Sequence, residues 1–240
     1  MAFSESVLKA RQDGFRLLRG KGIEIGAFHE PAPLPADAHV TYADVFTRAQ
    51  AIELFPEVDP SRMVDPTLIV DLDRTGLDSI GSDSLDFVIA CHVLEHLANP
   101  LLAIAEIFRV LGPGGRAVIA IPDKRFTFDQ PRPLTSFIHL WRDYMAHVPV
   151  SPDDHYLEFL CATTTWVAGL PPSQQNEHIQ RARRRREHSH VWDSESFRET
   201  LLITLPLVGR RARLIYESPG DANRFEYFSI WEKIPAPQIA

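Results

Sequence analysis

A group of polar residues follows a strongly apolar run near the middle of the chain. In the stretch LDFVIACHVLEHL, which begins at Leu85, the residues Cys91, His92, Glu95 and His96 come directly after the run FVIA. An apolar run rich in β-branched and aromatic residues predicts a strand buried on both faces of a parallel sheet. Because ligands bind at the carboxyl ends of strands in open α/β sheets, we expect chemistry at these side chains.

The spacing of His92 and His96 also fits a zinc site, because two histidines four residues apart on a helix can bind one metal ion. The zinc-protease pattern is H-E-x-x-H, whereas this sequence reads H-V-L-E-H at the end of a strand. The glutamate stands at the wrong position, and we therefore predict no metal. We expect Glu95 and His96 to fix the loop and His92 to contact a cofactor or substrate.

Short apolar runs alternate with amphipathic stretches along the first half of the chain. A helix is predicted from Asn99, a suitable N-cap, to Leu111, with Gly112 and Pro113 ending it. This order of strands and helices predicts a mostly parallel sheet. Parallel strands are predicted at 23–26, 40–43, 66–73, 87–91 and 116–122, and an antiparallel pair at 211–218 and 224–233.

The remaining segments are predicted to be helical and to belong to the same domain. We expect a single domain over 1–240, with an N-terminal helix over 1–20 and a further helix near 194–204. The segment 123–191 is polar and aromatic, and we predict a helical insertion there that covers the strand ends. Within it, the basic run 181–187 predicts either a solvated helix face or a local site for a phosphate or carboxylate.

The composition is that of an ordinary globular protein, with 45% hydrophobic and 24% charged residues among 240. A formal net charge of -7 argues against a nucleic-acid or anionic-membrane binder. The two cysteines are far apart, which excludes a disulfide framework and suits a reducing compartment. Neither a signal peptide nor an apolar run of about 20 residues is present. We therefore expect a soluble, cytoplasmic protein, and its oligomeric state does not follow from the sequence.

The motifs DFVIACHVLEHL, RVLGPGG and IPDKR, in this order, resemble those of class I S-adenosylmethionine-dependent methyltransferases, and most closely the bacterial small-molecule methyltransferase domains. The likeness spans nearly the whole chain and is most specific over 85–125. It implies a Rossmann-like α/β fold with a mostly parallel seven-stranded sheet, an antiparallel C-terminal edge pair and a helical insertion after the fifth strand. The stretch PDKRFTFDQPRPLT and the downstream HVW resemble methyltransferase-like proteins associated with polysaccharide or glycosyl transfer.

The resemblance implies S-adenosylmethionine as cofactor. Its site needs carboxylates for the ribose hydroxyls, an apolar slot for the base and exposed backbone near a glycine. The family's glycine motif is reduced here to one glycine, which argues against the pyrophosphate of NAD, since that group needs glycines and a helix N-terminus. The implied cofactor contacts are Glu24, Gly26 and Ala27 after the first strand, Asp44 at the ribose, Asp71 or its rival Asp73 at the adenine, and Cys91 with His92 beside the cofactor.

The predicted insertion carries an unusually polar set of residues. One interpretation is a salt-bridged surface; the other is an acceptor pocket in which Lys124, Arg125 and Arg132 hold an anionic group. His139 would belong to this pocket, and His190, with His188, would close it. For an oxygen or nitrogen acceptor, the expected catalytic base is His92, with His155 in reserve.

These expectations lead to one predicted function and one alternative. The prediction is methyl transfer from S-adenosylmethionine to a small-molecule or glycoconjugate acceptor, anionic acceptors included. The shortened glycine motif motivates the alternative, which is a non-catalytic binding or regulatory module with the same fold.

Overall fold

Seven strands form one twisted sheet in the order β3-β2-β1-β4-β5-β7-β6. The computed structural model describes residues 3–235. The strands from β3 to β5 are all parallel, while β7 lies between β5 and β6 and runs antiparallel to both. The predicted fold class is confirmed. The strands are β1 Gly20–Ile25, β2 Ala38–Asp44, β3 Leu68–Ile69, β4 Leu85–Cys91, β5 Leu111–Pro122, β6 Ala212–Ser218 and β7 Glu226–Lys233.

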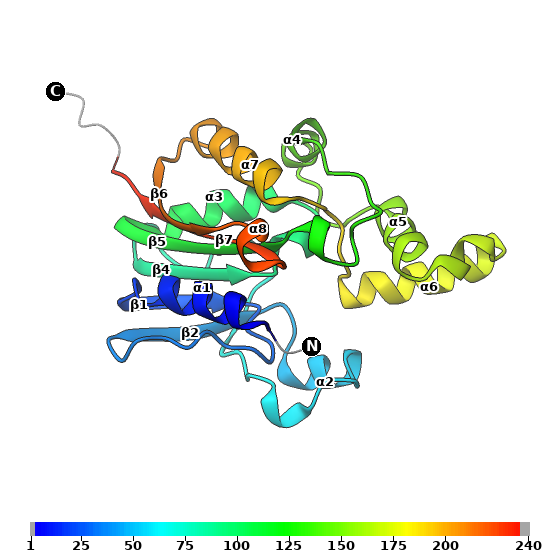
Figure 1. Ribbon diagram of the computed structural model, residues 1–240, viewed down its shortest axis with the longest axis horizontal. Coiled ribbons are helices and arrows are strands. Elements are labelled where there is room, and N and C mark those ends of the chain that lie inside the picture. The colour runs from blue at the N-terminus through cyan, green and yellow to red at the C-terminus, as the bar shows by residue number, and fades with distance from the viewer. Residues whose placement is uncertain (1–2, 236–240) are drawn as a thin grey trace.

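Helices cover both faces of this sheet (Figure 1). Successive residues of β4 point to opposite faces, so Val88 packs into one core and Phe87 into the other. The helices α3, Pro100–Val110, and α7, Ser194–Leu207, pack on the first face. On the second face, α1 places Phe15 edge-on against Phe228 of β7, with ring centroids 5.5 Å apart. The α1 helix spans Glu5–Phe15.

The second face lacks the helix that would follow β1 in a doubly wound fold. The proline-containing segment 27–37 connects β1 to β2 instead, and Ala32 and Leu34 pack against the sheet from it. The N-terminal helix is also shorter than the predicted range 1–20. It ends at Phe15 because Leu18 turns into the core, where 1% of its surface is exposed, and Gly20 already begins β1.

Three helices lie beyond the carboxyl ends of the parallel strands (Figure 1). They are α4 Phe137–Met145, α5 Asp153–Thr163 and α6 Pro172–Arg185, all within the predicted insertion 123–191. We call these helices, together with the segment 186–193 that follows α6, the cap. The helices α5 and α6 share a small apolar cluster of their own, which includes Tyr156, Phe159 and Ile179. Two short helices complete the fold, α2 Arg48–Leu54 and α8 Gly220–Asn223.

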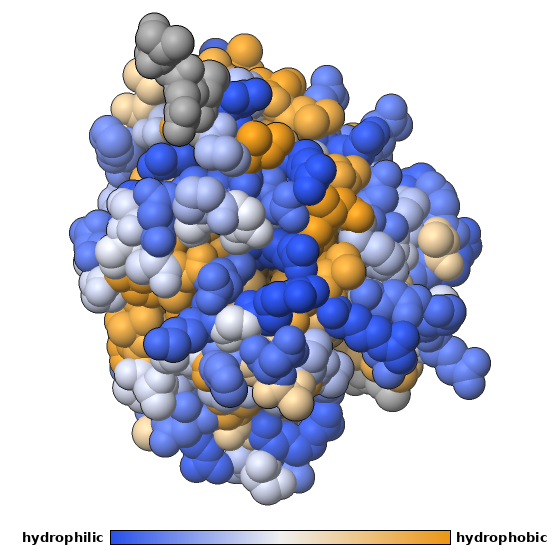
Figure 2. All heavy atoms as spheres, turned by 90° about the vertical axis from the view of Figure 1, so that its left-hand side faces the viewer, coloured by the Kyte–Doolittle hydropathy of each residue, from blue (hydrophilic) through white to orange (hydrophobic). Residues whose placement is uncertain are grey.

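The face opposite the cap lies at the amino ends of the parallel strands. Figure 2 shows hydrophilic residues over most of this face, with hydrophobic atoms in smaller areas between them. Among the helices of residues 3–235, none is both long and apolar enough to cross a membrane.

Candidate functional site

A cavity of about 470 Å³ opens at the carboxyl ends of β1, β2 and β4, which point toward the cap. In this strand order, β2 and β3 follow β1 toward one edge of the sheet, and β5 follows β4 toward the other edge. The crevice between two such strands is the usual ligand site of an open α/β sheet. The volume lies within the roughly 300–1,000 Å³ typical of small-molecule sites.

The end of β1 contributes Glu24, Gly26 and Ala27 to the cavity wall. Gly26 has a φ of 69°, and a Cβ there would lie 2.8 Å from Val93 Cγ2, so a side chain is excluded. The Glu24 carboxylate is 4% exposed and accepts a hydrogen bond from the Ala32 amide at 3.0 Å. Burial raises the pKa of Glu24 to about 7. Near neutral pH this acid is therefore ready to ionise when a cation binds beside it.

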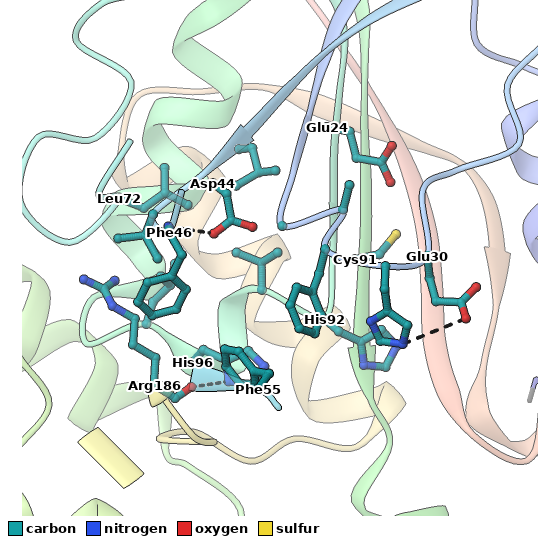
Figure 3. Close-up of a pocket in the computed structure, with 18 of the residues that line it drawn as sticks. Glu24, Glu30, Asp44, Phe46, Phe55, Leu72, Cys91, His92, His96 and Arg186 are labelled. Atoms are coloured by element: carbon teal, nitrogen blue, oxygen red, sulfur yellow. Dashed lines mark hydrogen bonds and ion pairs between the residues drawn. The ribbon is translucent and has the colours of Figure 1, made fainter. Parts of the chain in front are cut away.

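The end of β2 places Asp44 beside an apolar slot (Figure 3). The Asp44 carboxylate accepts a hydrogen bond from the Phe46 amide at 3.0 Å, and burial raises its pKa. Phe46, Phe55 and Leu72 line the cavity around it, with the two phenyl rings 6.2 Å apart. A carboxylate next to a flat apolar slot suits a nucleoside, whose sugar offers hydroxyl donors and whose base offers a face for packing.

The end of β4 contributes Cys91 and His92. His92 Nε2 lies 2.7 Å from Glu226 Oε2 and Nδ1 lies 3.4 Å from Glu95 Oε1. Burial lowers the pKa of His92, but the two carboxylates outweigh it and raise the pKa to about 9. His92 is therefore protonated at neutral pH and has no free lone pair, which removes the basis for the prediction that it acts as a base. Burial also raises the pKa of the Cys91 thiol.

Glu226 connects His92 to the N-terminal helix. Its carboxylate, buried at the start of β7, also accepts two hydrogen bonds from the Arg11 guanidinium, at 2.8 and 2.6 Å. Burial raises the pKa of Glu226, yet Arg11 and His92 together lower it to about 2. Nothing in the local pattern RFEYF marks Glu226 as a site residue, because its partners come from distant parts of the chain.

The two predicted adenine-binding acids, Asp71 and Asp73, do not line the cavity. Both face Arg186, whose Nη2 lies 2.6 Å from Asp71 Oδ2 and whose Nη1 lies 3.4 Å from Asp73 Oδ2. Arg186 follows α6 in a left-handed conformation and lines the cavity together with Arg185. The basic run thus joins the cap to the loop after β3, and it is not simply a solvated helix face.

The three cations expected to hold an anionic acceptor lie outside the cavity lining, and each has a partner of its own. The Lys124 ammonium donates to the carbonyl of Arg132. Arg125 pairs with Asp123 at 2.7 Å and with Asp221 at 3.0 Å. The buried Arg132 pairs with Asp129 at 2.8 Å and Glu158 at 2.9 Å. The structure therefore supports the salt-bridged interpretation of these residues over the anion-binding one.

The predicted histidines of the insertion also lie outside the cavity. His139, His155 and His190 lie close to one another, and each offers one ring nitrogen within 4.8 Å of the others. A second group of the same kind consists of Glu95, His96 and His188, of which His96 lines the cavity. Burial lowers the pKa of His96 to about 4, so this ring is neutral.

His29 is a cavity residue that the sequence did not single out. It follows Gly26 and Phe28 in the loop after β1, and its Nδ1 atom is buried without a hydrogen-bond partner. Burial lowers the pKa of His29, so the ring is neutral at pH 7. Its position only three residues after the glycine motif is the sequence signal that could have identified it.

The chain is similar in sequence to one family of known proteins. The family described as "Methyltransferase domain" matches residues 19–201. A search of curated proteins found no match.

Solved structures with this fold are similar at low sequence identity. One structure, from Rhodobacter sphaeroides, carries the provisional description of Zn-dependent alcohol dehydrogenases. It aligns with this chain with a TM-score of 0.54 and 16% identity, over 96% of this chain and 90% of that one. A second structure is a complex of the Haloferax volcanii Trm112 methyltransferase activator with a provisionally described methyltransferase. It aligns with a TM-score of 0.50 and 11% identity, over 96% of this chain and 89% of that one. A SAM-dependent methyltransferase from Aquifex aeolicus aligns with a TM-score of 0.45 and 14% identity, over 96% of this chain and 89% of that one.

These structural likenesses are likenesses of fold alone, since all are below 25% identity. The chain also spans about half the length of the CurJ carbon methyltransferase, covering 49% of it with a TM-score of 0.46 and 15% identity.

Proposed function

The chain belongs to the methyltransferase domain family, and we propose that its cavity binds S-adenosylmethionine and transfers the methyl group to a small-molecule or glycoconjugate acceptor. The observation that carries this proposal is the pairing of the partly buried Asp44 carboxylate and an apolar slot at the crossover point of the sheet, with the buried acid Glu24 nearby. In this assignment, Asp44 accepts from the ribose hydroxyls. Phe46, Phe55 and Leu72 pack against the adenine, and Glu24 faces the positively charged end of the cofactor.

The protein's main catalytic contribution is alignment, because the sulfonium arrives already activated for displacement. Holding acceptor and methyl group in line can contribute about 7 to 11 kcal/mol. The charge of His92 is fixed by Glu226 and Glu95, so we assign His92 to the wall of the methyl-transfer site. The neutral His29 takes the role of base for a hydroxyl or amine acceptor, and its replacement by alanine would lower kcat about 10² to 10⁴-fold.

The shape and charge of the cavity bear on the acceptor class. The cofactor would occupy much of the 470 Å³, so an acceptor enters with little more than the group to be methylated. A small molecule, or the terminal group of a glycoconjugate, meets this requirement. An anionic acceptor has less support, because Lys124, Arg125 and Arg132 have intramolecular partners.

Thermal unfolding with added ligands tests the cofactor assignment. At 100 times the dissociation constant, S-adenosylmethionine or S-adenosylhomocysteine would stabilise the protein by roughly 2.7 kcal/mol, which corresponds to a rise in Tm of about 5 to 11 °C, with no rise for NAD. Asp44→Ala would lose most of this rise. Asp65→Ala, which removes an exposed acid outside the cavity, serves as the matched control.

Formation of S-adenosylhomocysteine with a panel of neutral sugars, acidic sugars, amines and phenols then tests the transfer itself. Turnover that is lost in His29→Ala but retained in Asp65→Ala supports an enzyme. The engagement of Asp71 and Asp73 by Arg186 favours the alternative of a non-catalytic module. A rise in Tm with cofactor but no turnover with any acceptor class would favour that alternative, and no rise at millimolar ligand would contradict the cofactor assignment.

A further inference from the structure

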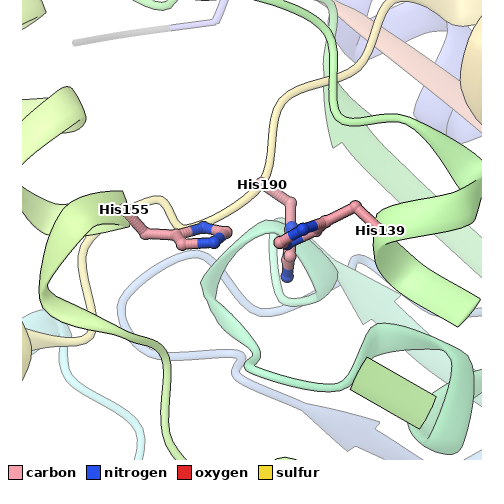
Figure 4. A group of neighbouring side chains, drawn as sticks. All are labelled: His139, His155 and His190. Atoms are coloured by element: carbon pink, nitrogen blue, oxygen red, sulfur yellow. The ribbon is translucent and has the colours of Figure 1, made fainter. Parts of the chain in front are cut away.

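Three histidines from separate parts of the cap meet at one place outside the cavity (Figure 4). His139 belongs to α4, His155 to α5, and His190 to the extended segment between α6 and α7. The ring centroids of His139 and His155 are 4.9 Å apart, and His190 lies 5.3 Å from His155 and 5.7 Å from His139. Each residue offers one ring nitrogen within 4.8 Å of the others. Three segments of the cap therefore present imidazoles to a common point.

His190 lacks the hydrogen bonds that a buried imidazole needs. Only 1% of its surface is exposed, and neither ring nitrogen makes a hydrogen bond of good geometry, although the backbone of Ala98 lies close to the ring. Buried polar groups are nearly always paired, and an exception needs an explanation. Hydrogen bonds among the three histidine rings would explain the exception, but no hydrogen bond joins these described side chains to one another.

The other two histidines differ in how their rings are held. His139 Nε2 lies 3.1 Å from Asp143 Oδ2 but makes no hydrogen bond to it. His155 is oriented by its second ring nitrogen, because Nδ1 donates to the carbonyl of Ser189 at 2.8 Å. Metal-binding histidines are typically oriented in this way, with one ring nitrogen bonded to a carbonyl or carboxylate and the other directed at the ion. Burial also lowers the pKa of His190 well below its usual value, which favours the neutral ring that can act as a ligand.

The neighbouring group of Glu95, His96 and His188 has a different explanation. The oxygens of its carboxylate are also buried without a hydrogen bond, but the protonated His92 lies beside them, with Nδ1 3.4 Å from Oε1, so the negative charge is balanced within the protein. A divalent ion there would also be close to this cation. At the three-histidine group, the Asp143 carboxylate lies 3.1 Å from His139. The charge of Arg132, which also acts on His190, is paired with Asp129 and Glu158.

We infer that His139, His155 and His190 bind a divalent transition metal ion, with Zn²⁺ as the expected occupant, and that the ion fastens α4 and α5 to the segment before α7. Imidazole ligands suit zinc, and three of them leave a fourth position for water or a carboxylate. Zinc–nitrogen distances of about 2.0–2.1 Å place ligand nitrogens roughly 3.3 Å apart, so nitrogens that now lie within 4.8 Å of one another must approach by up to about 1.5 Å on binding. His139 and His155 are only partly buried and can make this movement.

The site adjoins the cavity through the backbone. The amides of Ser189 and His190 both donate to the carbonyl of Glu95, at 2.7 and 3.0 Å, and Glu95 contacts His92 in the cavity wall. The ion would thus fix the cap over the strand ends. This inference does not depend on the proposed methyl transfer, because its test measures metal binding alone.

The test titrates Zn²⁺ into metal-free protein without a histidine tag, by calorimetry and by thermal unfolding. We expect one ion per chain and a rise in Tm, and an intense visible absorption when Co²⁺ replaces Zn²⁺ in a tetrahedral site. His139→Ala and His155→Ala should each weaken binding at least 100-fold. Asp143→Asn should weaken it about 10 to 100-fold, as expected for a residue that orients a ligand. His39→Ala removes an exposed histidine of β2 and should leave binding unchanged.

His190→Ala is informative only if it folds, and the two partly exposed histidines keep the test decisive if it does not. Absence of Zn²⁺ binding up to millimolar concentration would overturn the inference. Binding that survives in His139→Ala and His155→Ala but is lost in His188→Ala would overturn it as well, because the ion would then occupy the group at Glu95.

Discussion

His92 shows how two distant acids can decide the chemistry of one side chain. Glu226 and Glu95 raise its pKa to about 9, whereas an ordinary histidine titrates near 6.5. A raised pKa in the folded protein means that the charged pair stabilises the fold at pH values below 6.5. This contribution is lost as the pH rises through about 9. His92 is therefore a structural cation at neutral pH and would become a base only in alkaline solution.

This leads to a prediction about stability against pH. His92→Asn keeps a residue that tolerates the left-handed φ of 56° but removes the charge. The variant should be less stable than the parent protein by about 2 to 3 kcal/mol at pH 6, since the side chain is only 23% exposed, and the difference should shrink toward zero by pH 10. Urea unfolding at both pH values measures it. A difference that stays constant with pH would contradict the assigned charge.

Glu24 gives a second prediction, this one about cofactor affinity. With a pKa of about 7, half of the Glu24 side chains are neutral at pH 7, and a positively charged ligand binds best to the ionised form. S-adenosylmethionine should therefore bind about tenfold more weakly at pH 6 than at pH 8.

Calorimetric titration of Glu24→Gln provides the comparison. The cofactor's own amino group titrates in the same way with both proteins, so the ratio of their affinities isolates Glu24. The same pH dependence in Glu24→Gln would show that the charge of Glu24 has no part in binding.

Among the secondary-structure elements, α3 depends on its N-cap. Asn99 is fully buried, its side-chain oxygen accepts from the Leu102 amide at 3.1 Å, and its side-chain amide donates to the Asp143 carbonyl at 3.3 Å. The same residue therefore caps α3 and holds it to α4. Its backbone amide also donates to Asp73 at 3.0 Å, which ties the helix start to the loop after β3.

Asn99→Ala should destabilise the protein by about 1 to 2 kcal/mol, because the capping bond to the Leu102 amide and the hydrogen bond to the Asp143 carbonyl are both lost. For a chain of this length the expected fall in Tm is about 2 to 8 °C. Asn176→Ala, at an exposed position within α6, should lower Tm by less than about 2 °C. Equal effects of the two substitutions would show that the buried cap does not stabilise α3.

At the scale of the whole molecule, the cap helices differ in how they join the sheet: α4 packs into the main core through Leu140, whereas α5 and α6 do not. The helices α5 and α6 pack mainly on each other, and Arg186 ties the end of α6 to the loop after β3 through Asp71 and Asp73. Segments with small cores and few ties open more readily than central strands. We therefore expect faster amide hydrogen exchange in α5 and α6 than in β4 or α3.

Arg186→Ala should increase this exchange in the last turns of α6 and lower the stability of the protein by about 1 to 2 kcal/mol, because Asp73 would keep a buried charge without its partner. Arg184→Ala, at an exposed position two residues earlier, is the matched control. Exchange rates in α6 that respond equally to both substitutions would argue against Arg186 as the tie.

The sequence by itself determined the fold class, the edge of the sheet where the cavity lies, and several residues of its wall. Strand positions follow from local apolar periodicity, and the residue after a parallel strand must lie at the ligand-binding edge. For this reason His92 could be placed from the sequence, and the resemblance to the methyltransferases placed Glu24, Gly26 and Asp44. The separate apolar runs and the PGG turn also predicted a mostly parallel sheet.

Only the tertiary structure decided what those side chains can do. Glu226 is 134 residues from His92, and Arg186 is 115 residues from Asp71, yet these pairs fix the charge of His92 and withdraw Asp71 from the cavity. The grouping of His139, His155 and His190 likewise depends on how three segments of the cap meet. Coulomb attraction and burial act between groups that are close in space, and local periodicity carries no information about pairs so distant in the chain.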